Sequence, residues 1–157
     1  MSDIPRGSFP KTAHLLKHSD FQRVYQQGRR YFSGNMTVFY LRTVNEVAPG
    51  VNGVWTAESV RAHKKDGVRV GFTVSRALGG SVERNRMRRR TREAVRRHLQ
   101  MLQETSFAVD VVINPKKSLL AAEFRLISQE IERAFRVIRK DCEVAEEKSG
   151  KQEARHG

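Results

Sequence analysis

A run of arginines with helical spacing constrains this chain more than any other feature. Eight arginines lie within the fourteen residues from Arg84 to Arg97. Other residues interrupt and follow them at intervals of three and four, as the buried side of a helix requires. These are Met87, Thr91, Ala94, Val95, Leu99 and Leu102. The pattern predicts one helix with a buried stripe and a strongly basic exposed side.

The arginines of this helix carry more charge than its acids can neutralise. At about 100° per residue, the side opposite the stripe carries Arg86, Arg89, Arg90, Arg96 and Arg97, with Arg88 and Arg92 at its border and Arg84 in the first turn. A solvated face normally mixes signs that pair four residues apart, but Glu93 is the only acid between Arg84 and Arg97. Because guanidinium groups bind phosphate bidentately, the run favours nucleic-acid contact over a solvated face.

The composition of the whole chain agrees with a polyanionic partner. Its 157 residues include 30 Lys+Arg and 17 Asp+Glu, a net charge of +13, and such an excess predicts partners rather than a fold. The length suits a single domain. The single cysteine, Cys142, excludes an internal disulfide and favours a reducing compartment. No segment approaches the roughly 20 apolar residues that span a bilayer. We therefore expect a cytoplasmic protein that does not enter a membrane.

The order of apolar segments predicts an α+β domain. We expect a flexible segment at 1–14, a folded domain at 15–142 and a disordered polar tail at 143–157, because the tail has almost nothing to bury. A short helix that ends at Gly28 carries Phe21, Val24 and Tyr25 on one face. Strands are predicted at 36–42 and 68–75, joined by a long hairpin connection, and a buried strand at 107–113. A last helix with apolar residues from Phe124 to Ile138 follows.

The sequence offers no constellation of residues for catalysis or metal binding. Its five histidines lack metal-ligand spacing with one another or with Cys142. His98 lies on the apolar side of the basic helix, so we expect it to pack rather than to bind a ligand. Glycine-rich phosphate loops and nucleophile motifs are absent from the sequence. If the protein takes part in catalysis, we expect the reacting groups to belong to its partner.

Several of these segments together resemble one family. The stretch Phe72-Thr73-Val74-Ser75-Arg76 leads through Gly79 into Arg84-Asn85-Arg86-Met87-Arg88-Arg89 and then Arg92-Glu93-Ala94. This resembles the signature of the protein subunit of bacterial ribonuclease P. Asp20-Phe21-Gln22-Arg23-Val24-Tyr25, Val38-Phe39-Tyr40 and Val109-Asp110-Val111-Val112-Ile113 are similar to other segments of that family, in the same order. The resemblance covers about residues 15–138.

The resemblance implies a fold and a function. The fold is a small, mostly antiparallel sheet packed with helices, with a left-handed strand–helix–strand crossover that is shared with a ribosomal-protein domain. The function is that of the protein subunit of an endoribonuclease, which binds a catalytic RNA and removes the 5′ leader of precursor tRNA. In such an assembly the RNA performs the hydrolysis and binds most of the Mg²⁺, protein side chains alone bind none, and no other protein is required.

The resemblance also implies two RNA-binding surfaces and no catalytic residue. The catalytic RNA would be bound by Arg76, Arg84, Asn85, Arg86, Arg88, Arg89, Arg90 and Arg92. The leader would be bound in a cleft formed by Phe21, Tyr25 and Tyr40, because bases of any sequence stack on aromatic rings. The alternative for Phe21 and Tyr25, four residues apart on a helix, is an ordinary core position.

The chain departs from the family pattern at three places, and two other functions stay open. Ala77 and Gly80 stand where many relatives have a basic residue and an asparagine. The 44–67 connection, with His63, Lys64 and Lys65, is longer than expected, so no role can be carried over to it. The alternatives are a ribosome-associated or general RNA-binding module and a DNA-binding protein. The second is less favoured, because eight arginines contact backbone more than bases.

Overall fold

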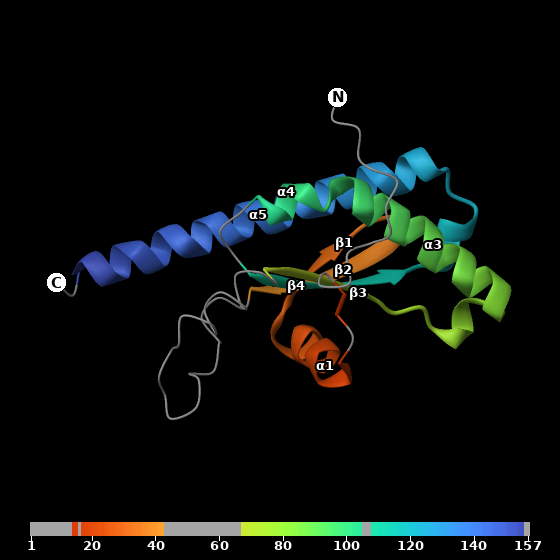
Figure 1. Cartoon of the computed structure of the whole chain (residues 1–157), viewed down its shortest axis with the longest axis horizontal. Coiled ribbons are helices and arrows are strands. Elements are labelled where there is room, and N and C mark those ends of the chain that lie inside the picture. The colour runs from red at the N-terminus through yellow and green to blue at the C-terminus, as the bar shows by residue number, and fades with distance from the viewer. Residues whose placement is uncertain (1–13, 16, 43–66, 105–107, 156–157) are drawn as a thin grey trace.

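A computed structural model describes residues 14, 15, 17–42, 67–104 and 108–155 of the chain. Its main elements are shown in Figure 1 and are, in chain order, α1 (His18–Gln27), β1 (Arg29–Phe32), β2 (Met36–Arg42), β3 (Val68–Phe72), α3 (Ser81–His98), α4 (Gln100–Gln103), β4 (Val109–Pro115) and α5 (Phe124–Arg155). Short 3₁₀ turns η3 (Arg76–Leu78) and η4 (Lys117–Leu120) follow β3 and β4. Our predictions for the segment before residue 14, for His63, Lys64 and Lys65, and for Phe107 concern residues outside this description.

The sheet has four strands in the order β1-β2-β4-β3. β2 pairs antiparallel with β1 and with β4, whereas β3 pairs parallel with β4. The predicted hairpin between β2 and β3 is therefore wrong, because β4 lies between them. β4 is buried along nearly its whole length, and a central position is the one that covers both faces of such an apolar strand. The actual hairpin joins β1, which sequence reasoning missed, to β2.

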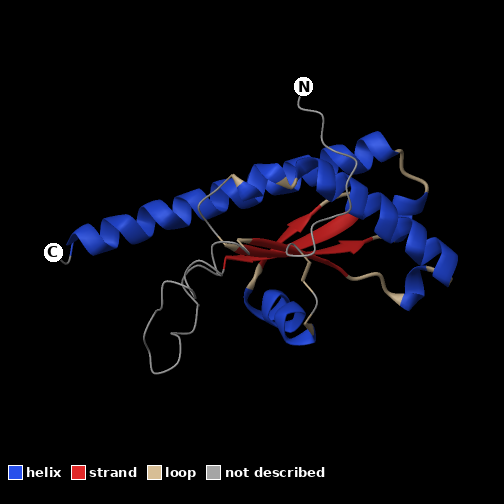
Figure 2. Cartoon of the chain, viewed as in Figure 1, coloured by secondary structure: helices blue, strands red, loops and turns tan. Residues whose placement is uncertain are grey.

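The two faces of the sheet have different helical cover (Figures 1 and 2). α3 and α5 lie on one face and α1 lies on the other. Side chains alternate between the faces along each strand. Val38 and Tyr40 of β2 belong to the large core under α3 and α5, whereas Phe39 packs in a smaller cluster with Val24 of α1. The α+β class and the mostly antiparallel sheet are thus confirmed.

The basic helix connects two neighbouring parallel strands. The chain leaves β3, turns through η3, runs through α3 and α4 and returns as β4 beside β3. Every member of the predicted stripe, from Met87 to Leu102, is buried. At the start of α3, Gly79 has a φ of 148°, a left-handed conformation that glycine adopts without strain. The Glu83 carboxylate accepts a hydrogen bond from the Gly80 N–H at 3.3 Å.

α5 continues much further than the sequence indicated. We predicted a disordered tail from residue 143, whereas α5 runs to Arg155 and extends beyond the sheet (Figure 1). Glu, Lys, Gln and Ala dominate this part of the chain, and these residues favour helix even without a core to pack against. Arg139 and Glu143 add an ion pair four residues apart. Within the described residues, no helix is both long and apolar enough to cross a membrane.

Candidate nucleic-acid interface

The first half of α3 displays most of the predicted basic residues. Asn85, Arg86, Arg89 and Arg92 are exposed, Arg84 and Arg88 are half-buried, and η3 adds the exposed Arg76. We call these seven residues the basic surface. The Arg88 guanidinium donates a hydrogen bond to the Asn85 side-chain oxygen at 3.1 Å. Among the described residues, no carboxylate forms an ion pair with a member of the basic surface.

Arg90 does not belong to this surface, contrary to our prediction. Its guanidinium donates hydrogen bonds to the backbone oxygens of Leu119 at 2.7 Å, Leu120 at 3.2 Å and Ala122. Partial burial and the neighbouring Arg86 both lower the pKa of Arg90. The side chain thus fastens α3 to η4. Helical periodicity could not show this, because η4 lies about thirty residues further along the chain.

The second half of α3 is partly neutralised and docked on α5. Glu93 accepts hydrogen bonds from Arg96 at 2.7 and 3.0 Å and from Arg97 at 3.3 Å. The hydrogen bond from Arg96 is the largest cause of the lowered pKa of Glu93. Arg96 is mostly buried, although we had placed it on the exposed side, and Arg97 lies over the Phe124 ring at 4.7 Å. The basic character of α3 is therefore concentrated in its first three turns.

His98 is a packing residue, as predicted. Its Nε2 lies 2.8 Å from Ser128 Oγ on α5. Burial is the main cause of the lowered pKa of His98, and Arg97 and Arg136 lower the pKa further while Glu132 opposes them. Within the described part of the chain, no group of three or more His, Cys, Asp or Glu side chains is placed to bind a metal ion.

On the other face of the sheet, aromatic side chains gather between α1 and β2. Phe21 and Tyr25 of α1 are half-buried against Phe39 of β2. The rings of Tyr25 and Phe39 meet edge to face with centroids 4.8 Å apart. The Tyr25 hydroxyl is hydrogen-bonded to Thr73 Oγ1 at 2.8 Å and Asn114 Oδ1 at 3.0 Å. We call Phe21, Tyr25 and Phe39 the aromatic face.

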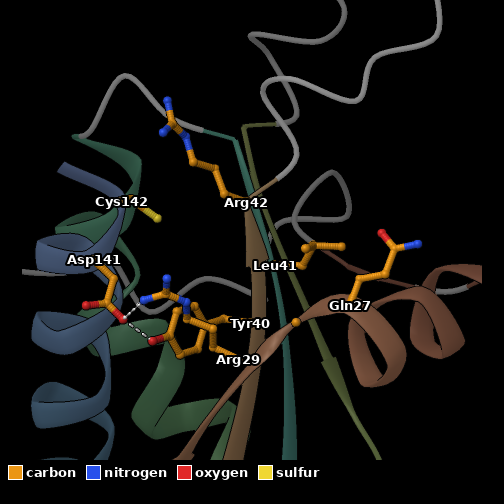
Figure 3. Close-up of a pocket in the computed structure, with 8 residues that line it drawn as sticks. Gln27, Arg29, Tyr40, Leu41, Arg42, Asp141 and Cys142 are labelled. Carbon is orange, nitrogen blue, oxygen red and sulfur yellow. Dashed lines mark hydrogen bonds and ion pairs between the residues drawn. The ribbon is translucent and has the colours of Figure 1, made fainter. Parts of the chain in front are cut away.

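Tyr40, the third residue of our predicted cleft, lies on the opposite face of the sheet. Its hydroxyl donates a hydrogen bond to Asp141 of α5, as Figure 3 shows. Burial and this hydrogen bond raise the pKa of Tyr40 far above its ordinary value. Because neighbouring residues of a strand point to opposite faces, Phe39 occupies the place that we had assigned to Tyr40. Two-residue alternation along β2 was the signal that could have identified it.

A hollow of about 210 Å³ surrounds this Tyr40–Asp141 contact. Arg29 approaches Asp141 at 3.5 Å, so the carboxylate neutralises a charge at the wall of the hollow (Figure 3). Cys142 lies beside it, and burial raises the pKa of its thiol to about 11. The thiol is therefore protonated at neutral pH, and the charged side chains that line this hollow are one carboxylate, Asp141, and two guanidinium groups, Arg29 and Arg42.

A buried carboxylate holds α1 against the sheet, and sequence reasoning missed it. Asp110 of β4 accepts hydrogen bonds from Arg69 of β3 at 2.7 and 2.9 Å and from Arg23 of α1 at 3.3 Å. Arg69 also reaches Asp20 of α1 at 3.4 Å. The network fixes the helix that carries Phe21 and Tyr25. An acid in the middle of an apolar strand was the available signal, because a buried charge requires partners.

These surfaces define a class of protein. A single α+β domain presents a helix of arginines on one side of a sheet and partly exposed aromatic rings on the other, without a metal-binding group in its described residues. Arginine binds phosphate and aromatic rings stack on bases. This combination is typical of a protein that binds nucleic acid.

The comparisons with known proteins identify the family. The family model Ribonuclease P matches residues 9–139. A ribonuclease P protein component from Chloroflexus aggregans is 37% identical over 121 residues, which cover 73% of this chain and 75% of the relative. The ribonuclease P protein component from Acidothermus cellulolyticus is 31% identical over 124 residues, which cover 79% of this chain and 86% of that relative. The chain therefore belongs to the ribonuclease P protein family, the protein components of an endoribonuclease.

Solved structures support the same fold. The structure of a Staphylococcus aureus RNase P protein mutant with defective mRNA degradation activity has a TM-score of 0.61 at 21% identity and covers 82% of this chain and 90% of that one. The RNase P protein from Thermotoga maritima has a TM-score of 0.52 at 20% identity, with 76% and 96% covered. At these identities the likeness concerns the arrangement of helices and strands.

Proposed function

We propose that this chain binds the catalytic RNA of ribonuclease P through the basic surface and the 5′ leader of precursor tRNA through the aromatic face. The assembly would remove the leader and form the mature 5′ end of the tRNA. Tyr40 has no part in the proposal, because it lies under α5, and Arg90 has none because it is bound to η4. Phe39 takes the place of Tyr40 in the leader site.

The observation that carries the proposal is the uneven charge along α3. Both arginines of the second half, Arg96 and Arg97, are paired with Glu93, whereas exposed arginines in the first half, such as Arg86 and Arg89, have no acidic partner among the described residues. Folding does not explain this arrangement, since like charges on one helix face repel one another. RNA phosphates would relieve the repulsion, and their contact with a backbone needs no particular sequence.

The aromatic face supports the second half of the proposal. Its rings are half-buried, so each packs against the sheet with one side while another part stays accessible. Arg30 of β1 lies over the Phe39 ring, with its guanidinium carbon 5.5 Å from the centroid, and adds a positive charge beside the rings. Stacking on rings tolerates any base, which suits leaders of different sequence.

The catalytic groups and the metal ions belong to the RNA in this proposal. Phosphoester hydrolysis by metal ions requires ligands that fix their geometry, and we assign these ligands to RNA phosphates, with Mg²⁺ as the ion. The protein would contribute substrate binding and charge neutralisation. It requires no protein partner, and we place the assembly in the cytoplasm, where precursor tRNA is made.

Cleavage of a precursor tRNA tests the proposal. A bacterial ribonuclease P RNA is incubated with a 5′-leader precursor at low magnesium concentration, with and without the full chain. We expect cleavage at the mature 5′ end that depends on the protein, and tighter binding of the precursor than of mature tRNA. RNA binding without stimulation or preference would instead support the general RNA-binding module.

A further inference from the structure

A second hollow lies at the β3 edge of the sheet, where the basic surface and the aromatic face meet. Its volume is about 240 Å³, and Arg88 and Arg92 of α3 line it on one side. Phe21 of α1 lines it on the other, and Gly71 and Phe72 of β3 lie between them. The hollow thus contains members of both surfaces, which the sheet otherwise separates.

The apolar walls of this hollow are aromatic. Phe72 is half-buried, and the Arg92 guanidinium carbon lies 5.9 Å from the centroid of its ring. The Phe21 ring lies over Gly71, at a place where the Cβ of any other residue would collide with it. The missing side chain therefore lets the α1 ring lie directly on the backbone of β3. Two rings and a glycine make walls against which a flat ring system can pack.

The charged wall has no counterion of its own. Arg88 and Arg92 are one helical turn apart, where like charges repel. No carboxylate is among the described residues that line this hollow. The other hollow, which Arg29 and Arg42 line, does contain a carboxylate, because Asp141 lies there and pairs with Arg29. An anion is therefore the missing partner in the hollow at β3, and guanidinium groups bind phosphate best.

We propose that this hollow binds one nucleotide of single-stranded RNA. Its phosphate would bind to Arg88 and Arg92, and its base would stack on the Phe72 ring. The inference rests on the proposed function, because it places a defined nucleotide between the two RNA-binding surfaces. The nucleotide belongs either to the precursor leader or to an unpaired position of the catalytic RNA, which present the same chemistry.

The chain contains a matched control for this site. Arg97 lies over the Phe124 ring as Arg92 lies over Phe72, and both rings pack at the border of the same core. Arg97, however, is paired with Glu93. Phe72→Leu and Arg92→Gln therefore test the hollow, while Phe124→Leu and Arg97→Gln make the same chemical changes at a site where the arginine has an acidic partner. Arg92 is exposed, so its substitution leaves the core intact even if the Phe72 variant folds poorly.

The experiment uses the full chain with a bacterial ribonuclease P RNA. The affinity of each protein for the RNA alone is measured first, and then the affinity of each assembly for precursor tRNA and for mature tRNA. A set of precursors carries an abasic site at each leader position in turn. We expect Phe72→Leu and Arg92→Gln to weaken either the affinity for the catalytic RNA or the affinity for precursor tRNA by about 5-fold or more. The two control variants should leave both affinities unchanged.

The outcomes separate the two sources of the nucleotide and the two proposals. If the variants bind precursor tRNA more weakly, and the wild type loses the same affinity when one particular leader position is abasic, the nucleotide belongs to the leader. A weaker affinity for the catalytic RNA alone in Phe72→Leu as well as in Arg92→Gln identifies a nucleotide of that RNA, because the basic surface by itself predicts a loss only for Arg92→Gln. If Phe72→Leu behaves like Phe124→Leu while the wild type still prefers the precursor, the nucleotide site is wrong and the proposed function stands. If the wild type shows no preference for precursor over mature tRNA, the result contradicts leader binding in the proposed function.

Discussion

At the scale of single residues, the alternation of Phe39 and Tyr40 decides which ring is available to RNA. Phe39 packs edge to face with Tyr25, whereas Tyr40 lies on the other face of β2 and is bonded to Asp141. The two residues are adjacent in sequence and aromatic, so composition alone cannot separate them. Their roles are expected to differ completely, because one faces α1 and the other faces α5.

Substitution of these two rings should give opposite results. Phe39→Leu is expected to weaken the preference for precursor over mature tRNA by about 5-fold or more, because a stacking surface is lost, with little change in affinity for the catalytic RNA. Tyr40→Phe should leave the preference intact and lower the free energy of unfolding by about 1 kcal/mol, the worth of a hydrogen bond. Binding titrations and urea unfolding measure the two quantities. If Tyr40→Phe lost the preference for precursor over mature tRNA, Tyr40 would belong to the leader site after all.

His98 should make stability depend on pH. Burial lowers its pKa in the folded protein, while the unfolded chain titrates near pH 6.5. At neutral pH the His98 side chain is mostly uncharged in both the folded and the unfolded state. As pH falls below about 6.5, the unfolded state takes up a proton first, so the free energy of unfolding falls until the folded state also protonates. Urea unfolding between pH 7 and 5 should show a steeper decline for the wild type than for His98→Gln. Parallel curves would contradict this account.

At the scale of elements, α1 is held on the sheet by charge as well as by apolar contact. Asp110 is 2% exposed and its partner Arg69 is 29% exposed. Arg23 joins the same carboxylate from α1. Removal of one member from a buried ion network leaves the others without compensation. The position of the aromatic face therefore depends on a residue that touches no RNA in our proposal.

Asp110→Asn tests this dependence with little change in shape. We expect the free energy of unfolding to fall by about 3 kcal/mol, at the lower end for a broken buried pair because Arg69 is partly solvated. The preference for precursor tRNA should fall as well, since α1 loses its anchor. Ile138→Val serves as a core control on the opposite face, which should lower stability by about 1 kcal/mol and leave the preference unchanged. Equal preference in both variants would show that apolar packing alone positions α1.

At the scale of the whole molecule, the net charge of +13 is not spread evenly. Arg90, Arg96 and Arg97 of α3 are bound to protein groups, and the exposed arginines that remain lie in its first turns. The formal charge of the helix thus overstates the number of RNA contacts that it can make. Salt dependence of binding measures that number directly, because each phosphate contact releases condensed counterions.

Arg86→Ala and Arg89→Ala should each lower the slope of log affinity against log salt concentration by about one. Arg136→Ala is the control, because Arg136 is exposed on α5 but paired with Glu132. Its slope should equal that of the wild type. The measurement is a titration of the catalytic RNA at several salt concentrations. Equal slopes for all four proteins would mean that the basic surface does not contact phosphates.

The sequence by itself determined the features that depend on neighbouring residues. The spacing from Met87 to Leu102 was sufficient for α3 and its buried stripe, because helical periodicity is a local property. The bounds of β2 were predicted correctly for a similar reason. The signature around Arg84-Asn85-Arg86 identified the family, and the excess of arginine indicated the kind of partner.

Only the tertiary structure decided which of these residues are exposed and which are bound to other parts of the protein. Arg90 is bound by η4, Tyr40 by α5, and Asp110 joins β4 to α1 and β3. These partners are far apart in the chain, so their contacts depend on how the elements pack and not on local spacing. β4 took the central position between β2 and β3 because both its faces are apolar. That placement brought the edge of β3 between α1 and α3 and created the hollow in which the two surfaces meet.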